Sequence, residues 1–471
     1  MVNDLSPYPK YRESGIPWLG PVPSHWALER TKWHFHNRKE LNSNNDQRNI
    51  LSLTLRGVVN NDPDNPEGLV PKDYRTYQLF AKGDLVFKLI DLENLRTSRV
   101  GLVHEDGIMS SAYVRLVPTA STNIRYFLHQ FYDLYSRGIY NQLGAGVRST
   151  LGPLDLLNVG IVIPPLDEQA AIVRFLDSAI DRLERATRAK RKVIALLKEQ
   201  QQGIIRQAIS RGLDSSVPLK PSSIPCLDQI PQHWRVLPLK AVCEIQSGIT
   251  LGKDYTCHIV HSYPYLRVAN VQAGYTNLAV IKTIYVSEAE ALRSTLRKGD
   301  VLMTEGGDPD KLGRGCVWDA KIAPCLHQNH IFAVRPDQSQ LIPHFLSVLT
   351  STTYARAYFQ STAKQTTNLA ATNKTKIGLL KLLLPPVNEQ NEILTAINQS
   401  CRPISNTMSR LEREIELLRE YRIRLVADVV TGKLDIREAA TPFPEKTPAT
   451  TPGAGINLYS ETEVGDEEAL I

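Results

Sequence analysis

The chain changes from a strand-like to a helical pattern within one short stretch, IPPLDEQAAIVRFLDSAID at residues 163–181. The paired prolines end the preceding apolar run, because proline cannot donate a backbone hydrogen bond. Asp167 is a candidate N-cap for the helix that follows, and Glu168 suits the positive end of the helix dipole. From here mainly apolar residues recur with a heptad period. The seam of this heptad consists of Val173, Ile180, Thr187, Ile194, Gln201 and Ala208, alternating with Leu176, Leu183, Lys190, Leu197 and Ile204.

A second stretch of the same kind, LPPVNEQ at residues 384–390, begins another heptad with Asn388 as its candidate N-cap. Pro403 predicts a break or kink near the beginning of this second helix. Polar residues interrupt the first seam, and polar seam residues fix register more than they add stability. The second seam consists of Leu394, Cys401, Met408, Ile415, Arg422 and Val429, alternating with Ile397, Ile404, Leu411, Leu418 and Leu425.

Further peptides occur twice in the same order. IPWLGPVPSHW (16–26) returns as IPCLDQIPQHW (224–234), and KGDLVF (82–87) returns as KGDVLM (298–303). Matches that keep their order and nearly their offset indicate a tandem duplication. In each half a section with short β-rich runs and Gly, Asn and Pro turns precedes the helix. The sequence therefore predicts an α+β fold with two globular domains related by internal duplication.

Two helices of about 40 residues would each be about 60 Å long, and each needs a partner for its apolar stripe. We expect them to form an antiparallel coiled coil, with one globular domain at each end. The alternative is that each helix packs separately on its own domain. The predicted division of the chain places globular domains at 1–165 and 216–386, helical spacers at 166–215 and 387–440, and a disordered acidic tail at 441–471.

The net charge of +6 is unevenly distributed, because residues 441–471 contain six acids and one lysine and the rest of the chain carries +11. A basic body suits a polyanionic partner, although many ordinary proteins are also basic. No apolar run approaches the length of a membrane span, and the N-terminus lacks a signal peptide, so the cytoplasm is the expected location. The six cysteines form no CxxC pair, which favours reduced thiols over a zinc site or disulfides.

The sequence offers little support for catalysis. It has neither a GxGxxG after a predicted strand nor a phosphate-binding GxxxxGK[ST] loop. The proline pairs lack the amide or carboxylate before them, and the aromatic ring after them, that amino-methyltransferases use to hold adenine. EGGDPDKLGRG (305–315) contains carboxylates and a lysine, but its glycines favour a polar loop over a metal nuclease site. We therefore expect no catalytic residue, no metal and no cofactor in this chain.

The order of IPWLGPVPSHW, IPPLDEQ with its helix, IPCLDQIPQHW, TEGGDPDKLGRGCVW (304–318), LPPVNEQ and the terminal helix resembles the specificity (S) subunit of type I restriction-modification systems. The resemblance covers about residues 10–440. It implies two target recognition domains that each read one half of a bipartite, asymmetric site in double-stranded DNA, with the helices as a ruler. It also implies two modification subunits that methylate adenine with S-adenosylmethionine, and two restriction subunits, using ATP and Mg, as optional further partners. The S subunit itself is non-catalytic, acts in the cytoplasm of bacteria or archaea, and needs no membrane.

Side chains that read base edges or hold phosphate are cationic, amide or hydroxyl groups. In the first half the candidate DNA-binding residues are Lys88, Arg96, Thr97, Ser98, Arg99, Arg148, Ser149 and Thr150. In the second half they are Arg267, Asn270, Gln272, Asp308, Lys311, Arg314, Lys364, Gln365, Thr366, Thr367 and Asn368. The candidate subunit-docking residues on the helices are Arg182, Arg185, Glu412, Glu416 and Tyr421. For each of these residues the alternative is an ordinary solvated side chain.

Two other classes of protein stay open from the residues alone. A single-chain DNA methyltransferase or nuclease would transfer methyl groups or cut DNA without partners. A two-headed protein-binding scaffold would show DNA affinity that does not depend on salt, whereas phosphate binding weakens steeply as salt rises.

Overall fold

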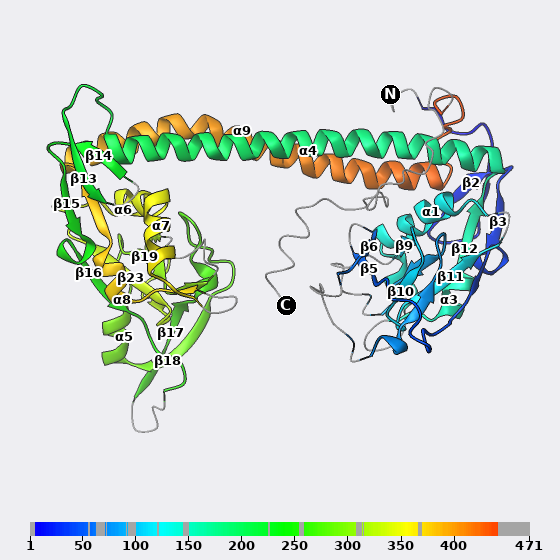
Figure 1. The fold of residues 1–471 in the computed structure, drawn as a ribbon, viewed down its shortest axis with the longest axis horizontal. Helices are drawn as coiled ribbons and strands as arrows, with labels where there is room; N and C mark the ends of the chain where they lie inside the picture. Colours follow the sequence, from blue (N-terminus) through cyan, green and yellow to red (C-terminus); the bar gives the residue numbers. More distant parts are fainter. Residues whose placement is uncertain are drawn as a thin grey trace. The chain divides into compact units, whose positions relative to one another are not determined.

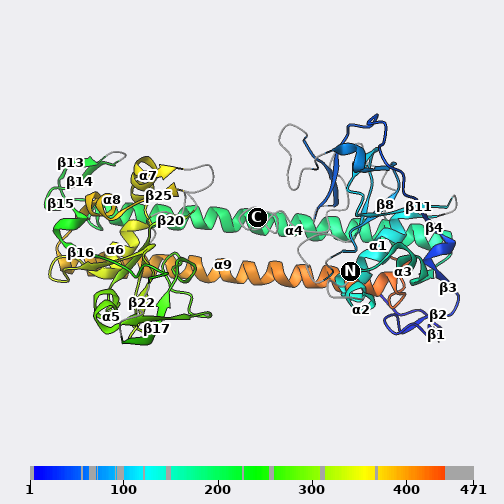
Figure 2. The ribbon, with the colours of Figure 1, turned by 90° about the horizontal axis from the view of Figure 1, so that it is seen from below.

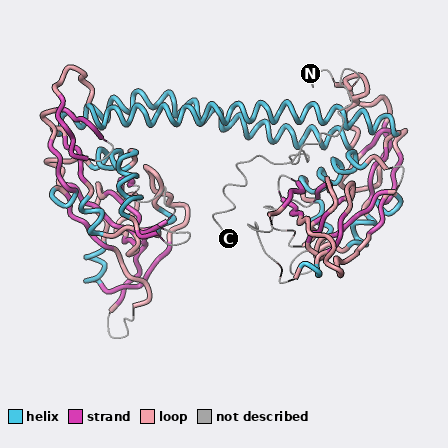
Figure 3. The backbone as a smooth tube through the Cα atoms, in the orientation of Figure 1, coloured by secondary structure: helices cyan, strands magenta, loops and turns pink. Residues whose placement is uncertain are grey.

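The computed structural model describes residues 5–54, 57–62, 71, 73–90, 92, 100–119, 122–144, 150–224, 227–253, 259–307, 313, 315–365 and 370–440. The chain forms two compact units, unit 1 from residues 1–191 and 412–471 and unit 2 from residues 192–411. Each unit contains short strands, short helices and part of two long helices, α4 (Leu166–Arg211) and α9 (Val387–Val430) (Figures 1 and 3). The proposed tail at 441–471 lies outside the described residues, and the five-segment division of the chain stays a prediction.

Unit 1 is built on a four-stranded antiparallel sheet in the order β4-β11-β8-β9 and on two-stranded pairs β12-β3, β1-β2, β10-β7 and β5-β6. Its short elements are β1 (Tyr11–Glu13), β2 (Pro21–Pro23), β3 (Ala27–Arg30), η1 (Thr31–Trp33), β4 (Phe35–Asn37), β5 (Leu51–Thr54), β6 (Gly57–Asn60), η2 (Tyr74–Thr76), β7 (Gln78–Phe80), β8 (Leu85–Phe87), β9 (Val100–Leu102), β10 (Gly107–Met109), β11 (Val114–Pro118), α1 (Ile124–Ser136), α2 (Ile139–Leu143), α3 (Pro153–Asn158) and β12 (Gly160–Ile163).

Unit 2 repeats this plan with the sheet β16-β23-β19-β21 and the pairs β15-β26 and β13-β14, and it adds the sheets β18-β17-β22 and β20-β25-β24. Its short elements are β13 (Leu219–Ile224), β14 (Leu227–Pro231), β15 (Arg235–Pro238), η3 (Leu239–Ala241), β16 (Cys243–Ser247), β17 (Val260–Leu266), η4 (Val268–Asn270), β18 (Lys282–Ser287), α5 (Glu288–Ser294), β19 (Val301–Thr304), β20 (Gly306–Gly307), β21 (Gly315–Val317), β22 (Leu326–His327), β23 (Ile331–Pro336), α6 (Pro343–Thr350), α7 (Thr353–Thr362), β24 (Lys364–Gln365), β25 (Ala370–Ala371), α8 (Lys374–Leu379) and β26 (Lys381–Leu384).

The repeated KGD peptide has the same structural role in both units. Asp84 is buried and accepts a hydrogen bond from Arg115 Nε of β11 at 2.6 Å. Asp300 is buried at the equivalent place and accepts from Arg335 Nε of β23 at 2.8 Å. A buried carboxylate needs such a partner. The peptide is therefore repeated because it fixes neighbouring strands of the main sheet, and the predicted duplication is confirmed in the topology.

The other two repeated peptides contact each other. Trp26 and Trp234 are fully buried. In unit 2, Glu389 in the first turn of α9 accepts from Trp234 Nε1 at 3.0 Å and is hydrogen-bonded to the His233 ring at 2.8 Å. In unit 1, Glu168 is hydrogen-bonded to the His25 ring at 3.0 Å and accepts from the Tyr8 hydroxyl. The PxHW and PPxxEQ peptides thus join the beginning of each domain to the beginning of its long helix.

In unit 1 the long helices run antiparallel. Lys190 Nζ of α4 donates to Glu414 of α9 at 2.6 Å, and Glu184 of α4 is paired with Arg422 of α9 at 3.6 Å. Residue numbers therefore rise along α4 as they fall along α9. Figures 1 and 2 both show the two ribbons side by side within this unit.

Unit 2 continues the antiparallel pairing, with Gln201 Nε2 of α4 donating to Ser405 Oγ of α9 at 3.1 Å. All predicted seam residues of both helices are buried or half-buried. The predicted antiparallel coiled coil is confirmed, and the alternative of two separately packed helices is wrong. Polar seam residues Lys190 and Gln201 find polar partners on the opposite helix, as expected for residues that fix register.

The predicted break at Pro403 and the two predicted N-caps are wrong, and the predicted kink at Pro403 stays a prediction. Helix α9 runs without a break through Pro403, whose ring is exposed. The seam residues Cys401 and Ile404 on the two sides of Pro403 are buried, and Gln399, whose carbonyl loses its N–H donor to the proline, is an exposed residue. Asp167 and Asn388 are not N-caps, because α4 begins at Leu166 and α9 at Val387. The prolines before these residues instead provide the first helical carbonyls.

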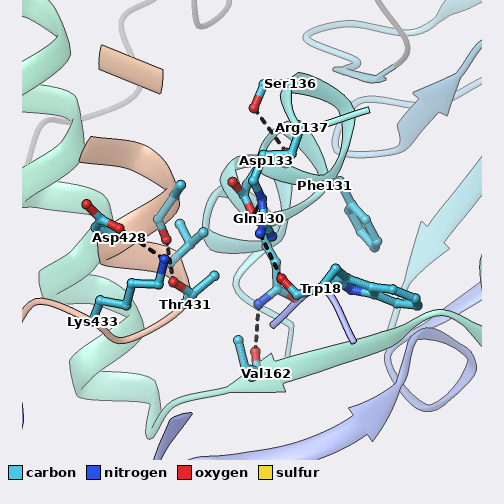
Figure 4. Close-up of polar contacts among 12 residues, drawn as sticks. Trp18, Gln130, Phe131, Asp133, Ser136, Arg137, Val162, Asp428, Thr431 and Lys433 are labelled. Carbon is cyan, nitrogen blue, oxygen red and sulfur yellow. Dashed lines mark hydrogen bonds and ion pairs between the residues drawn. The ribbon is translucent and has the colours of Figure 1, made fainter. Parts of the chain in front are cut away.

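Helix α1 lies beside β12 and the end of α9 in unit 1 (Figure 4), and the Tyr126 hydroxyl donates to the carbonyls of Val162 at 3.0 Å and Val430 at 3.4 Å. Gln130 Nε2 donates to the Val162 carbonyl at 3.0 Å, and Arg137 Nη1 donates to the Trp18 carbonyl at 2.7 Å. The chain after α9 stays in the same core, since Ile436 and Ala440 are buried there. Within the described part of the chain, no helix is long and apolar enough to cross a membrane.

Candidate nucleic-acid interface

The two candidate DNA-binding segments of the second half leave from one small sheet in unit 2. Strand β20 pairs with β25, and β25 pairs with β24. Residues 308–314 follow β20, and residues 366–369 connect β24 to β25. The Thr372 backbone N–H also donates to the Glu305 carbonyl at 2.7 Å. The structure therefore attaches both segments at the same place.

The first half attaches its candidate segments in the same way. The Leu151 backbone N–H donates to the Leu89 carbonyl at 3.0 Å. Leu89 and Leu151 occupy the positions of Glu305 and Thr372 when the two halves are aligned on the KGD and PPxxEQ peptides. Residues 93–99 and 145–149 thus leave from neighbouring points in unit 1. The sequence analysis missed these four anchoring residues, because the alignment of the halves pairs their positions but does not reveal their hydrogen bonds.

Most of the candidate side chains themselves lie outside the described part of the chain. These residues are Arg96, Thr97, Ser98, Arg99, Arg148, Ser149, Asp308, Lys311, Arg314, Thr366, Thr367 and Asn368. The backbone of Gln365 is described, but its side chain is not. Among the described candidates of these segments, Thr150 and Lys364 are exposed and Lys88 is half-buried. Exposed hydroxyl and ammonium groups beside the anchors suit phosphate contacts.

The segment 308–314 has further anchors in unit 2. Gly313 has a φ of +68°, and a Cβ atom there would lie 2.2 Å from the ring of Phe359 on α7. Glycine is therefore required both by its left-handed conformation and by the close approach of the ring. The ring of His330 is hydrogen-bonded to the Glu305 carboxylate at 2.7 Å, next to the start of the segment.

The third candidate group, Arg267, Asn270 and Gln272, lies in the loop around η4 in unit 2. Asn270 is buried, its Oδ1 accepts from the Arg267 backbone N–H at 2.8 Å, and its Nδ2 donates to the carbonyls of Asn277 and Val280. These bonds close the loop and leave the amide unavailable to bases, so the structure argues against Asn270 as a DNA contact. Gln272 Nε2 donates to the Ala269 carbonyl, and Arg267 is half-buried. Val271 packs in one cluster with Cys316, which follows segment 308–314.

The five candidate docking residues are all exposed on the α4 and α9 portions of unit 1: Arg182, Arg185, Glu412, Glu416 and Tyr421. Two of them have partners on their own helix, since Arg185 is paired with Asp181 at 3.4 Å and Glu416 with Arg413 at 2.9 Å. Exposed ion pairs of this kind contribute little to stability. Their side chains are therefore available to a partner at small cost.

The metal-ligating side chains of the described residues lie apart from one another, and most of their thiols are buried. No cluster of three or more His, Cys, Asp or Glu side chains among them could hold a metal ion. The four cysteines in the described part of the chain are free thiols. Burial raises the pKa of Cys243, Cys316 and Cys325 to about 12, which keeps these thiols protonated at neutral pH.

Known proteins resemble this chain along both halves. The family described as "Type I restriction modification DNA specificity domain" matches residues 38–193 and again residues 231–417. The EcoKI specificity subunit of Escherichia coli K12 is 25% identical over 275 residues, which are 57% of this chain and 56% of that protein. The StySPI specificity subunit of Salmonella potsdam is 22% identical over 336 residues, 68% of this chain and 70% of that protein.

A solved structure shares the fold. It is described as "Structural basis underlying complex assembly and conformational transition of the type I R-M system", and its chain superposes with a TM-score of 0.59 at 16% identity, covering 88% of this chain and 99% of that one. The chain spans about half the length, 47% and 56%, of two curated relatives that it matches. Since the two family matches fall on the two repeats and together cover most of the sequence, the chain belongs to the type I restriction-modification DNA specificity family.

Proposed function

We propose that this chain is the DNA-specificity subunit of a type I restriction-modification complex, and that each unit reads one half of a bipartite, asymmetric site. One observation carries the proposal. In both units two segments rich in polar residues are attached by equivalent hydrogen bonds, Leu151 to Leu89 and Thr372 to Glu305, while the segments themselves differ in sequence. A common support with different side chains suits two readers of different bases.

The partners follow from the same proposal. Double-stranded DNA binds the polar segments, two modification subunits dock on the exposed faces of α4 and α9, and two restriction subunits can join the complex. The partner subunits then bind S-adenosylmethionine, ATP and Mg, and this chain binds none of them. The complex works in the bacterial or archaeal cytoplasm.

Methylome sequencing tests the proposal directly. Cells expressing this chain with its modification subunit should carry methylated adenines in one bipartite motif. Gln365→Ala should relax or lose the half-site read by unit 2, and Arg148→Ala the half-site read by unit 1, each leaving the other half-site intact. Methylation without a bipartite motif, or both half-sites lost in either variant, would contradict the proposal.

Salt titration separates DNA binding from protein scaffolding. Each phosphate contact contributes a slope of about −0.9 to the dependence of log affinity on log salt. Lys364→Ala should therefore lower the slope by about one unit if the ammonium group binds phosphate. A salt-independent affinity would favour the scaffold, and methyl transfer by the isolated chain would favour the single-chain enzyme.

We also propose that the paired helices set the number of base pairs between the half-sites. Removing one heptad from each helix at paired positions, residues 192–198 and 408–414, keeps the seam and shortens it by about 10.5 Å. At about 3.4 Å per base pair, the preferred gap should then shrink by about three base pairs. An unchanged gap in the methylome of this variant would refute the ruler.

A further inference from the structure

Unit 1 has an open groove lined by its β3-β12 strand pair, by η1 and by the last residue of α3; β3, β12 and α3 lie together in Figure 1. The groove has a volume of about 800 Å³. Its lining residues are Ile16, Leu28, Glu29, Arg30, Lys32, Trp33, Asn158 and Gly160. Trp33 is 66% exposed. It lines the groove together with the half-buried Ile16 and Leu28, and apolar side chains that are exposed together mark a binding surface.

Two cationic side chains, Arg30 and Lys32, line the groove together with Trp33. Lys32 Nζ lies 5.5 Å from the ring centroid, and Arg30 Nη1 donates to Asn158 Oδ1 at 3.3 Å. The carboxylate in the groove, Glu29, is hydrogen-bonded to the ring of His34 at 2.7 Å. The groove therefore offers an apolar ring with cationic neighbours, which suits an acidic segment that contains apolar side chains.

The duplication shows that this groove is not required by the fold. In unit 2 the position of Trp33 is occupied by Ala241, and the position of Gly160 by Lys381, whose Nζ donates to the Ser223 carbonyl at 3.0 Å. The side chain of Ile16 occupies the place that a Cβ atom at position 160 would need, since such an atom would lie 2.5 Å from Ile16 Cδ1. The groove thus belongs to unit 1, and its occupant is expected once per chain.

We infer that residues 441–471 of this chain bind in the groove. These residues contain six acids and one lysine, together with apolar residues such as Phe443, Tyr459 and Leu470 among the acids and prolines. Their charge is opposite to that of Arg30 and Lys32, and they also occur once per chain. Proline-rich stretches such as TPFPEKTP lose little conformational entropy when they bind an aromatic groove.

The chain length permits this binding. Ala440 is buried in the core of unit 1, and the guanidinium group of Arg437 lies 5.2 Å from the centroid of the Tyr8 ring. From Tyr8 to Ile16 in the groove the chain spans at most about 28 Å. The path from Ala440 to Tyr8 adds at most about 30 Å, and 18 extended residues cover about 59 Å, so the segment reaches the groove with its acidic end to spare. A tethered segment has an effective concentration of about 1 mM, so a Kd of about 0.1 mM would cover the groove about 90% of the time.

Tryptophan fluorescence tests the inference, because Trp33 is the exposed one of the five tryptophans. Trp26, Trp234 and Trp318 are fully buried, and Trp18 is half-buried. Acrylamide should quench Trp33 severalfold more strongly in a chain that ends at Ala440 than in the full chain. A peptide of residues 441–471, added to the shortened chain, should restore protection at low salt and lose it at high salt.

Charge reversal identifies the binding surface. Arg30→Glu combined with Lys32→Glu should give the full chain the quenching of the shortened one, and Lys240→Glu, at the position of Lys32 in unit 2, should change nothing. Trp33→Phe should remove the quenching difference between the two chain lengths. Equal quenching of the full and shortened chains would overturn the inference. Protection that depends on protein concentration, or that arises only when a modification subunit is added, would also overturn it by identifying a second copy or a partner protein as the occupant.

Discussion

Replacing Arg115 by methionine should destabilise unit 1 and leave unit 2 unchanged. Methionine keeps most of the apolar length of the side chain but removes the charge that faces Asp84. The two side chains are 5% and 4% exposed, and their atoms are 2.6 Å apart. After the replacement, the one other hydrogen bond to the Asp84 carboxylate among the described residues comes from the Ala81 backbone N–H at 2.7 Å.

The size of the effect follows from this burial. Unit charges 2.6 Å apart attract by about 6 kcal/mol at an effective dielectric constant of about 20, and the desolvation of both groups offsets part of that attraction. Removing one member of a buried pair nevertheless costs about 3–5 kcal/mol, because the other charge stays buried. Amide exchange through opening of unit 1 should then be on the order of 100- to 5,000-fold faster.

Hydrogen exchange measured by mass spectrometry resolves the two units in one experiment. Strands β8 and β11 should lose protection in Arg115→Met, while β19 and β23 keep theirs. Arg335→Met should give the opposite pattern, and Arg424→Met, at an exposed pair with Glu420, should cost less than about 1 kcal/mol. If Arg115→Met lowered the free energy of opening of unit 1 by less than about 1 kcal/mol, or lowered that of both units equally, the reasoning would be refuted.

Three further changes have defined outcomes. Gly432→Ala should lower the Tm of unit 1 by more than Gly212→Ala lowers that of unit 2, since both have positive φ but a Cβ atom would lie 2.4 Å from a neighbouring carbon at Gly432 and 3.1 Å from a carboxylate oxygen at Gly212. Lys190→Glu should cost about 1 kcal/mol in thermal unfolding, and Glu414→Lys should restore the loss in the double variant. Burial lowers the pKa of His327 to about 4, so between about pH 6.5 and 4 the unfolded state binds a proton on this residue and the folded state does not. The free energy of unfolding of unit 2 should therefore fall by up to about 3 kcal/mol as the pH falls through this range, and it should fall less in His327→Gln.

The sequence predicted the features that depend on periodicity and repetition. The seam of α4 and α9 follows from heptad spacing alone, and the order of the repeated peptides identifies the two domains. The continuity of α9 through Pro403 was not predictable from propensity, because seam contacts with α4 outweigh the loss of one backbone hydrogen bond. Local sequence measures the cost of proline but not the packing that compensates for it.

The direction of side chains was also beyond the sequence. Asn270 has the chemistry of a base-reading residue, yet its amide closes the loop around η4. Glu168 and Glu389 have favourable positions for the helix dipole, but their bonds to His25 and His233 cross the repeat from its first peptide to its last. The contacts of Glu168 and Glu389 with the two histidines join residues more than a hundred positions apart, so a pattern in a short window cannot reveal them.

Comparison of the two units separates residues that maintain the fold from residues that are free to specify a partner. Asp84 and Asp300, which keep their arginine partners, cannot vary without leaving a buried charge unpaired. Trp33, in contrast, corresponds to Ala241, and both are exposed. An exposed position that accepts both an indole and a methyl group is not fixed by packing. If it is fixed at all, the cause lies in what each unit binds, which is why substitutions at such positions should change recognition while the unfolding of both units stays the same.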